Sequence, residues 1–168
     1  MNRKKGLVIL FICCQLLILG SMTGIRYYTK WYGKEIVLMT EPIPFEYVSR
    51  QKYVSLSYPI SKIPFSKWVG DDKPHSREKV YVLLRKEAKE YGVVGVTREK
   101  ITPKNENEVV LLGKYDYEIN NDMHITYGLE KYRLSNEDSH INRQQALQVH
   151  IKVSKYHQCI TSIEAKKE

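Results

Sequence analysis

The sequence has few of the residues from which disulfides, phosphate-binding loops and metal centres are built. It contains three cysteines, and Cys13 and Cys14 lie in an apolar run, so Cys159 is the one thiol in the rest of the chain. This count excludes a disulfide within the body of the protein. A glycine-rich phosphate loop is also missing. Among aromatic residues, 3 Phe and 2 Trp are outnumbered by 13 Tyr, a bias that suits strands and interfaces.

Acidic residues are absent from residues 1–34, which hold six of the 27 Lys and Arg residues. The remaining 21 basic residues are balanced by all 19 acidic ones, so the rest of the chain is nearly neutral. The net charge of +8 therefore reflects the N-terminus and not a basic stripe along a folded body. We expect no nucleic-acid partner.

The N-terminal segment has the pattern of a transmembrane anchor. A basic flank (residues 1–5) precedes an apolar run that only Gln15 interrupts before residue 20. A helix from Leu7 to Ile25 would span roughly 28 Å, close to the thickness of a bilayer's hydrocarbon core. We predict a membrane anchor over residues 6–25 and an interfacial belt over residues 26–34. The residues that carry this prediction are Leu7, Leu16, Leu17, Leu19, Tyr27, Tyr28 and Trp31.

The same segment also fits a cleaved secretory signal, although it lacks a good small-x-small cleavage site. A buried core helix is disfavoured because the run is apolar on all faces. An uncleaved signal-anchor and a cleaved signal both send the body outside the cytoplasm. We therefore expect a single-pass protein of the cell membrane, part of the cell envelope, with an extracytoplasmic domain over residues 35–164 and a tail over residues 165–168.

The body shows period-two alternation of apolar and polar residues, which predicts strands. We expect a mainly β (α+β) domain, an antiparallel barrel or sandwich of about 7–8 strands with one short helix over residues 135–148. A long loop over residues 59–78 would be held by Trp68, and Gly113 would mark a bulge or a bend. The predicted strands cover residues 35–40, 52–58, 79–86, 91–99, 107–119, 124–134, 147–153 and 158–163.

Three groups of side chains are candidate chemical sites. His150, His157 and Cys159 could bind zinc, but the alternation of 147–153 favours a surface histidine. Glu130 and Glu137 could act as an acid–base pair, although their spacing predicts no proximity. Ser55 and Ser57, which lie near Lys52 in the sequence, are more typical of the solvent-exposed face of a strand than of a catalytic Ser/Lys nucleophile pair. The sequence predicts no catalytic residue, no metal site and no cofactor.

Two segments resemble a known bacterial family. "QKYVSLSY" (residues 51–58) is similar to the signature Gly-Asp-Tyr-x-x-Leu-x-Tyr of the membrane-anchored GDYXXLXY family, with Gln51 and Lys52 in place of Gly-Asp. "ITYGLEKYRLSNED" (residues 125–138) resembles the second conserved segment of that family, with Arg133 in place of an aromatic residue. The matching residues are Tyr53, Leu56, Tyr58, Tyr127, Gly128, Glu130, Tyr132 and Glu137.

The resemblance implies location and shape, and the family has no assigned activity. Its genes often lie beside those of polytopic membrane proteins, which implies such a partner. We expect a membrane-anchored module that binds an unknown ligand, with a candidate functional surface made by Tyr53, Tyr58, Tyr127, Glu130, Tyr132 and Glu137. An envelope hydrolase that uses Glu130 and Glu137, and an assembly or stability factor for a membrane partner, are the alternatives.

Overall fold

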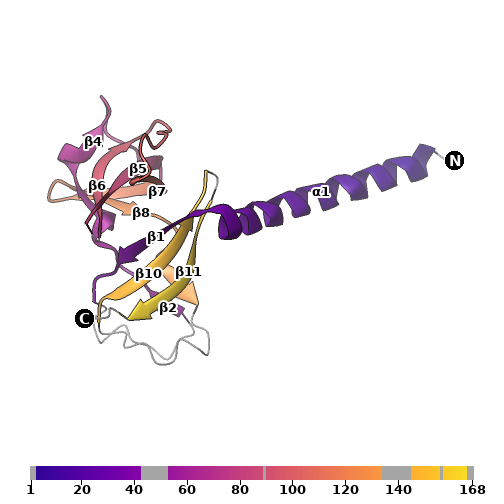
Figure 1. Cartoon of the computed structure of the whole chain (residues 1–168). Coiled ribbons are helices and arrows are strands. Elements are labelled where there is room, and N and C mark those ends of the chain that lie inside the picture. The colour runs from indigo at the N-terminus through magenta and orange to yellow at the C-terminus, as the bar shows by residue number, and fades with distance from the viewer. Residues whose placement is uncertain (1–2, 43–52, 89, 134–144, 156, 166–168) are drawn as a thin grey trace.

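The apolar N-terminal run forms one long helix. In a computed structural model, which describes residues 3–42, 53–88, 90–133, 145–155 and 157–165, helix α1 spans Arg3–Tyr32. Its segment Gly6–Tyr32 is long and apolar enough to cross a membrane, and none of its most apolar window is buried against the rest of the protein. Figure 1 shows α1 running clear of all the strands except at its C-terminal end. The seven residues that carry the anchor prediction lie on this helix with their side chains exposed: Leu7, Leu16, Leu17, Leu19, Tyr27, Tyr28 and Trp31.

The rest of the described chain is made of strands in three sheets. The first sheet has the order β1-β10-β11, the second is the pair β2-β9, and the third has the order β3-β8-β7-β5-β6-β4. All pairs are antiparallel except the short pair β4–β6. The strands are β1 (Lys34–Met39), β2 (Tyr53–Ser55), β3 (Lys62–Pro64), β4 (Trp68–Val69), β5 (Lys79–Glu87), β6 (Glu90–Thr97), β7 (Glu108–Ile119), β8 (Asp122–Thr126), β9 (Lys131–Arg133), β10 (Leu147–Val153) and β11 (Gln158–Ala165).

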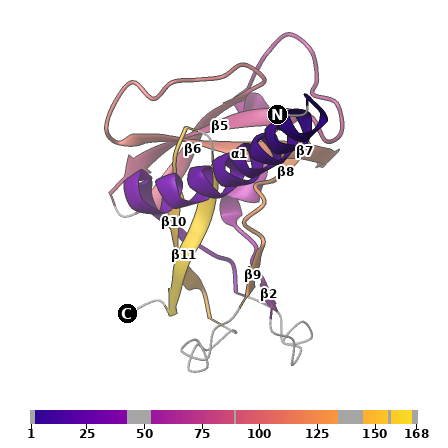
Figure 2. The same ribbon diagram turned by 90° about the vertical axis from the view of Figure 1, so that its right-hand side faces the viewer.

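These sheets form a half-barrel or sandwich-like domain around one apolar core, so the predicted mainly β fold class is confirmed. Alternate residues of each strand point inward, as the period of two requires. Figure 2 shows the β2–β9 ribbon below the six-stranded sheet and beside the β10–β11 hairpin. The innermost side chains are Tyr58, Ile36, Ile63, Leu84, Leu111, Met123, Leu147, Ile151, Val80, Val82, Val96 and Val149.

The described residues hold eleven strands where the sequence indicated about 7–8. The predicted 59–78 loop contains two of the additional strands, β3 and β4, with three-residue 3₁₀ helices at Pro59–Ser61 and Phe65–Lys67. The predicted strand 124–134 is divided into β8 and β9. Gly128 lies in this break with φ +73°, a left-handed conformation that ends regular pairing. The predicted helix over residues 135–148 falls largely outside the described residues, and its last two residues begin β10.

Gly113 does not form a bulge, one of the two irregularities (bulge or bend) that the sequence predicted there. It pairs regularly with Val80, and the irregularity lies between Tyr115 and Tyr117, where Asp116 has no partner residue on β8. The Thr126 hydroxyl donates a hydrogen bond to the Asp116 carboxylate there. The reason for glycine at position 113 is steric, because a Cβ would overlap the Cγ2 of Ile125.

Candidate functional site

The two segments that carry the family signature lie against each other although about 70 residues separate them in the chain. β2 and β9 pair antiparallel, with Tyr53 opposite Arg133 and Val54 opposite Tyr132. The pairing continues beyond the strands, because the Leu56 amide donates a 2.7 Å hydrogen bond to the Glu130 carbonyl oxygen. The signature therefore defines one structural unit, which we call the signature ribbon (residues 53–60 and 127–133).

Two buried tyrosines link the two segments of the signature ribbon, each donating a hydrogen bond to the opposite segment. The Tyr58 hydroxyl donates a 2.9 Å hydrogen bond to the Leu129 carbonyl oxygen. In return, the Tyr127 hydroxyl donates a 2.6 Å bond to the carbonyl oxygen of Ile60. Each ring is almost completely buried, at 1% and 5% exposure, so neither hydroxyl can exchange its partner for water. These two signature residues hold the fold together and offer no surface to a ligand.

The electrostatics of the signature ribbon keep both phenols protonated. Burial raises the pKa of Tyr58 and of Tyr127 above the usual tyrosine value, and the nearby Glu130 carboxylate adds to both shifts. Glu130 is half-buried, and its carboxylate accepts a hydrogen bond from the Tyr127 amide. This contact spans the turn around Gly128, so Glu130 stabilises the bend from which β9 begins.

Tyr53 differs from the other signature tyrosines because its side chain is 56% exposed. Residues directly opposite in an antiparallel pair project to the same side of the ribbon. Tyr53 and Arg133 therefore share one face with the pair Ser55 and Lys131, and all four residues are exposed. We call these four residues the ribbon face. It combines one aromatic ring with two cationic side chains.

Of the remaining predicted site residues, Tyr132 lies within the described part of the chain and Glu137 does not. Tyr132 lies opposite buried Val54 and packs in part against the core. Glu137 lies outside the described residues, so its predicted pairing with Glu130 stays a prediction. His150 projects away from the buried face of β10, with Nδ1 2.9 Å from a carboxylate oxygen of Glu35. In the part of the chain that the structure describes, no three His, Cys, Asp or Glu side chains are arranged to hold a metal.

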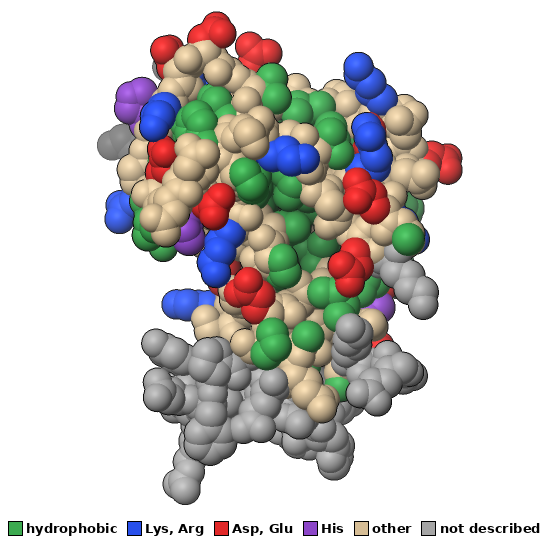
Figure 3. Space-filling view, turned by 90° about the vertical axis from the view of Figure 1, so that its left-hand side faces the viewer, with side chains coloured by type: hydrophobic (Ala, Val, Ile, Leu, Met, Phe, Trp, Pro, Cys, Tyr) green, Lys and Arg blue, Asp and Glu red, His purple; other side chains and the backbone are tan. Residues whose placement is uncertain are grey.

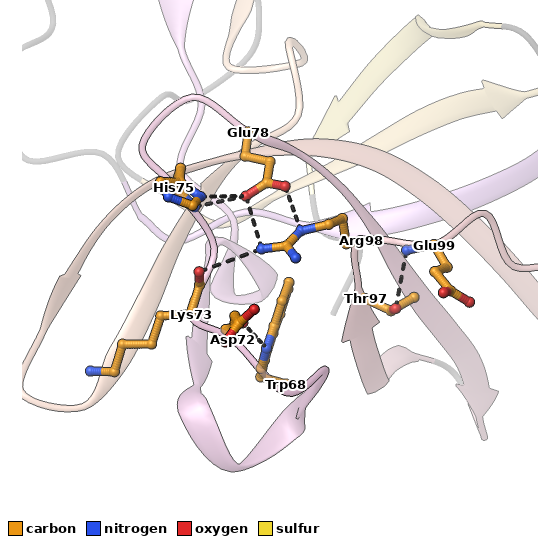
Figure 4. A network of polar contacts seen from close by, with 8 residues as sticks. All are labelled: Trp68, Asp72, Lys73, His75, Glu78, Thr97, Arg98 and Glu99. Carbon is orange, nitrogen blue, oxygen red and sulfur yellow. Dashed lines mark hydrogen bonds and ion pairs between the residues drawn. The ribbon is translucent and has the colours of Figure 1, made fainter.

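A polar cluster lies where β4, the start of β5 and the end of β6 come together (Figure 4). The His75 amide donates a 2.7 Å hydrogen bond to Glu78, and the Arg98 guanidinium also contacts that carboxylate. These two contacts lower the pKa of Glu78, the His75 amide having the larger effect. Trp68 donates its indole N–H to the Asp72 carbonyl oxygen at 3.0 Å. The cluster fastens the segment between β4 and β5 to the end of β6, so we interpret it as structural.

Sequence reasoning missed Lys131 and Arg133 as members of the ribbon face. The signal that could have found them is the alternation in residues 131–133, where an inward Tyr132 places both neighbours outward. It also missed Gln158, whose side-chain amide bonds both backbone groups of Leu112 at 3.0 and 2.8 Å. That contact joins β11 to the edge of β7, and no local pattern around residue 158 predicts it.

Comparison with known proteins agrees with the resemblance seen in these segments. The model of the GDYXXLXY protein family matches residues 15–160, a range that contains both halves of the signature ribbon. Neither the comparison with curated proteins nor that with solved structures finds a match. With its family model matched over most of its length, the chain belongs to the GDYXXLXY family.

Proposed function

We propose that the protein is a membrane-anchored interaction module whose ribbon face binds an acidic surface of a neighbouring integral membrane protein. In this proposal α1 is the anchor and the β domain lies outside the cytoplasm. The observation that carries it is the position of Tyr53, exposed beside Arg133 on a ribbon that two buried tyrosines hold in place. An exposed ring on a rigid support can be buried in a partner at little cost in conformational entropy.

The composition of the ribbon face supports a protein partner. Tyrosine and arginine are enriched at the energetically dominant positions of protein interfaces. Lys131 and Arg133 add two positive charges on the same side, which favours an acidic partner surface and predicts salt-sensitive association. The length and apolar composition of Gly6–Tyr32 support the membrane location, and so does the membrane partner that the family resemblance implies.

The hydrolase alternative has no observation in its favour, because Glu130 accepts the Tyr127 amide and braces a turn. The assembly-factor alternative shares the ribbon face and differs in its consequence. If the protein stabilises its partner, deleting the gene lowers the partner's abundance, whereas a pure binding module leaves that abundance unchanged.

Site-specific photocrosslinking in intact cells tests the proposal. A photoreactive phenylalanine analogue at position 53 should crosslink one membrane protein, and the same analogue at position 117 should not. Tyr117 is a matched control because it is a tyrosine of similar exposure, 51%, outside the ribbon face. Charge reversal by Lys131→Glu and Arg133→Glu should abolish the crosslink. Equal capture at positions 53 and 117 would contradict the proposal.

A further inference from the structure

The backbone of β9 points hydrogen-bonding groups away from β2 at alternate residues. In an antiparallel pair, residues that exchange backbone hydrogen bonds alternate with residues whose N–H and C=O groups point outward. The 2.7 Å bond from the Leu56 amide to Glu130 marks Glu130 as a bonded position, so Tyr132, two residues further on, is the next one. The N–H and C=O groups of Lys131 and Arg133 therefore face away from β2.

The corresponding edge of the β2 segment already has a neighbour in this chain. Ser57 has the outward orientation there, and its carbonyl oxygen accepts a 2.8 Å hydrogen bond from the Glu41 amide. The Ser57 hydroxyl also donates a 2.7 Å bond to the Glu41 carboxylate. Among the residues that the structure describes, no backbone group bonds to the outer side of β9, whose sheet partner is β2. The β9 edge is therefore the side on which the ribbon can be extended.

The side chains on this edge favour an acidic neighbour. Lys131 and Arg133 are exposed and lie on the same face as Tyr53. A residue directly opposite either cation on an added strand would project to that face, and opposite charges in such a cross-strand pair attract each other. The face of the domain turned away from α1 mixes acidic and basic side chains instead (Figure 3), so it offers an acidic strand no comparable preference.

Charged side chains on an edge strand also have a protective role, because they discourage pairing with a second sheet edge. Two copies of this chain that met antiparallel through β9 would bring Lys131 of each copy close to Arg133 of the other. Like charges directly opposite each other destabilise a sheet. The same two residues therefore disfavour a second copy of the chain and favour an acidic strand.

We propose that the membrane partner binds as an extended strand added antiparallel to β9, with acidic residues at the two alternate positions opposite Lys131 and Arg133. Both backbone groups of each cation would then bond to the partner strand. The inference rests on the proposed function. It adds the conformation of the partner segment and its residue pattern, two acidic residues separated by one other residue.

Amide hydrogen exchange measured by NMR tests this on the full-length protein in a non-ionic detergent. The probe is a blocked peptide of four Val-Glu repeats. In the free protein the amides of Lys131, Arg133 and Ser55 should all exchange fast, because each points outward. The peptide should slow exchange at Lys131 and Arg133 by roughly tenfold or more and leave Ser55, on the β2 edge, unchanged. Slow exchange at Lys131 and Arg133 without peptide, or equal protection of Ser55, would overturn the proposal.

Two methylated forms of the peptide give the matched comparison. In the proposed register the Glu residues turn their N–H groups towards β9, and the Val residues turn theirs away. Methylation of each Glu nitrogen should therefore abolish the protection, whereas methylation of each Val nitrogen should preserve it. A peptide of Val-Lys repeats should protect neither amide. Equal effects of the two methylated peptides, or protection by the Val-Lys peptide, would overturn the proposal.

In cells, proline at position 131 isolates the contribution of the backbone. Proline is tolerated at the first residue of an edge strand, and here it removes an outward N–H. Lys131→Pro should capture several-fold less partner from position 53 than Lys131→Ala, which removes the same charge, whereas Ser55→Pro should match Ser55→Ala. Equal capture by the two variants at position 131 would contradict strand addition. Circular dichroism shows whether the variants fold, and the peptide measurements on the wild type decide the outcome if Lys131→Pro does not.

Strand addition and the proposed function fail separately. A crosslink from position 53 without protection of the Lys131 and Arg133 amides refutes strand addition and leaves the proposed function standing. Absence of that crosslink refutes the proposed function, and with it the role of β9 in partner binding, whatever the peptides do.

Discussion

The hydroxyls of Tyr58 and Tyr127 each donate a hydrogen bond to a backbone carbonyl oxygen of the opposite segment. Both residues belong to the family signature, and their rings fill the core while their hydroxyls join two distant parts of the chain. Tyr53 lies three residues before Leu56 in the same motif, but its side chain points to solvent. At the scale of single residues, the signature therefore contains two kinds of tyrosine: Tyr58 and Tyr127 stabilise the fold, and Tyr53 is exposed to solvent.

Removing either buried hydroxyl should destabilise the protein without changing its fold. We expect Tyr58→Phe and Tyr127→Phe each to lower the free energy of unfolding by about 1–3 kcal/mol, because each leaves a buried carbonyl oxygen without its donor. Urea titration followed by circular dichroism measures the change. Tyr117→Phe, an exposed position, is the control and should change the free energy by less than about 0.5 kcal/mol. Variants at positions 58 and 127 that match this control would contradict the assigned role.

Alkaline pH should act on the same two residues. Their pKa values in the folded state are raised, so above about pH 10 the unfolded chain loses these protons before the folded one does. Ionisation in the unfolded state then favours unfolding, and stability falls as the pH rises past that point. The fall should be shallower in the Tyr58→Phe variant, as urea titrations between pH 8 and 11 can show. Parallel curves for variant and wild type would count against the raised pKa.

Acidic pH should act through Glu108, whose side chain is 4% exposed. The Lys104 amide at 2.9 Å and the Arg85 guanidinium at 3.0 Å lower the pKa of this carboxyl, the amide having the larger effect. Its contribution to stability is therefore present above the ordinary carboxyl pKa of about 4.3 and is lost as the pH falls through the lower folded-state pKa.

Glu108→Gln should be less stable than the wild type at pH 7, and the difference should shrink towards pH 3. Urea titrations at both pH values measure it. Glu99→Gln, at an exposed position, is the control and should resemble the wild type at pH 7. A difference between Glu108→Gln and the wild type that stays constant with pH would exclude this linkage.

At the scale of elements, the turn between β8 and β9 depends on the backbone conformation of one glycine. Gly128 has φ +73°, and a Cβ there would meet no atom within 4 Å. Gly128→Ala should therefore cost about 1–2 kcal/mol through conformation alone. Gly128→Asn should cost less, because asparagine tolerates the left-handed region better. Thermal melting of the two variants shows which is more stable. An asparagine variant less stable than the alanine variant would contradict this prediction.

The long strands could be predicted from the sequence because their alternation reflects burial directly. The inward faces predicted for residues 53–58 and 147–153 are confirmed, although β2 itself ends at Ser55. The buried side chains are Val54, Leu56, Tyr58, Leu147, Val149, Ile151 and Val153. The short strands β3 and β4 could not be predicted, because three Pro and a turn signal dominate residues 59–78. Strands of two or three residues are also too short to show an alternation of apolar and polar residues. The break at Gly128 was missed because one glycine within an apolar-polar alternation does not reveal the sign of its φ angle.

The candidate site could be predicted in part. The family resemblance identified both segments of the signature ribbon, but contacts between residues far apart in the chain, such as Tyr58 and Leu129 at a separation of 71 positions, depend on tertiary packing. The difference between buried Tyr58 and exposed Tyr53 could be predicted from the local alternation. The pairing of Tyr53 with Arg133 could not, because it depends on tertiary packing.

At the scale of the whole molecule, the protein is a β domain joined without a spacer to a long apolar helix. The junction at Thr29 and Ser154 fixes how the signature ribbon is held relative to the helix axis. In the proposed function, this rigid connection would present the ribbon face to one neighbour in the plane of the membrane. Loosening the junction should therefore weaken partner capture without altering the ribbon itself.

Insertion of a Gly-Ser-Gly-Ser segment between Tyr32 and Gly33 tests that expectation. The flexible linker should reduce photocrosslinking from position 53 several-fold, because it removes the fixed orientation. The midpoint of urea unfolding should change little, since the core residues are untouched. Undiminished crosslinking would mean that orientation by the helix is unimportant for binding.

The central claim is that the signature ribbon supports the fold through its buried tyrosines and binds through Tyr53. Its most direct test is Tyr53→Ala, examined for both stability and partner capture, with the photoreactive residue placed at the neighbouring exposed position 55. The account predicts a free energy of unfolding within about 0.5 kcal/mol of the wild type, as for an exposed side chain, together with loss of the crosslinked partner. Retention of the crosslink, or destabilisation comparable to that of Tyr58→Phe, would contradict it.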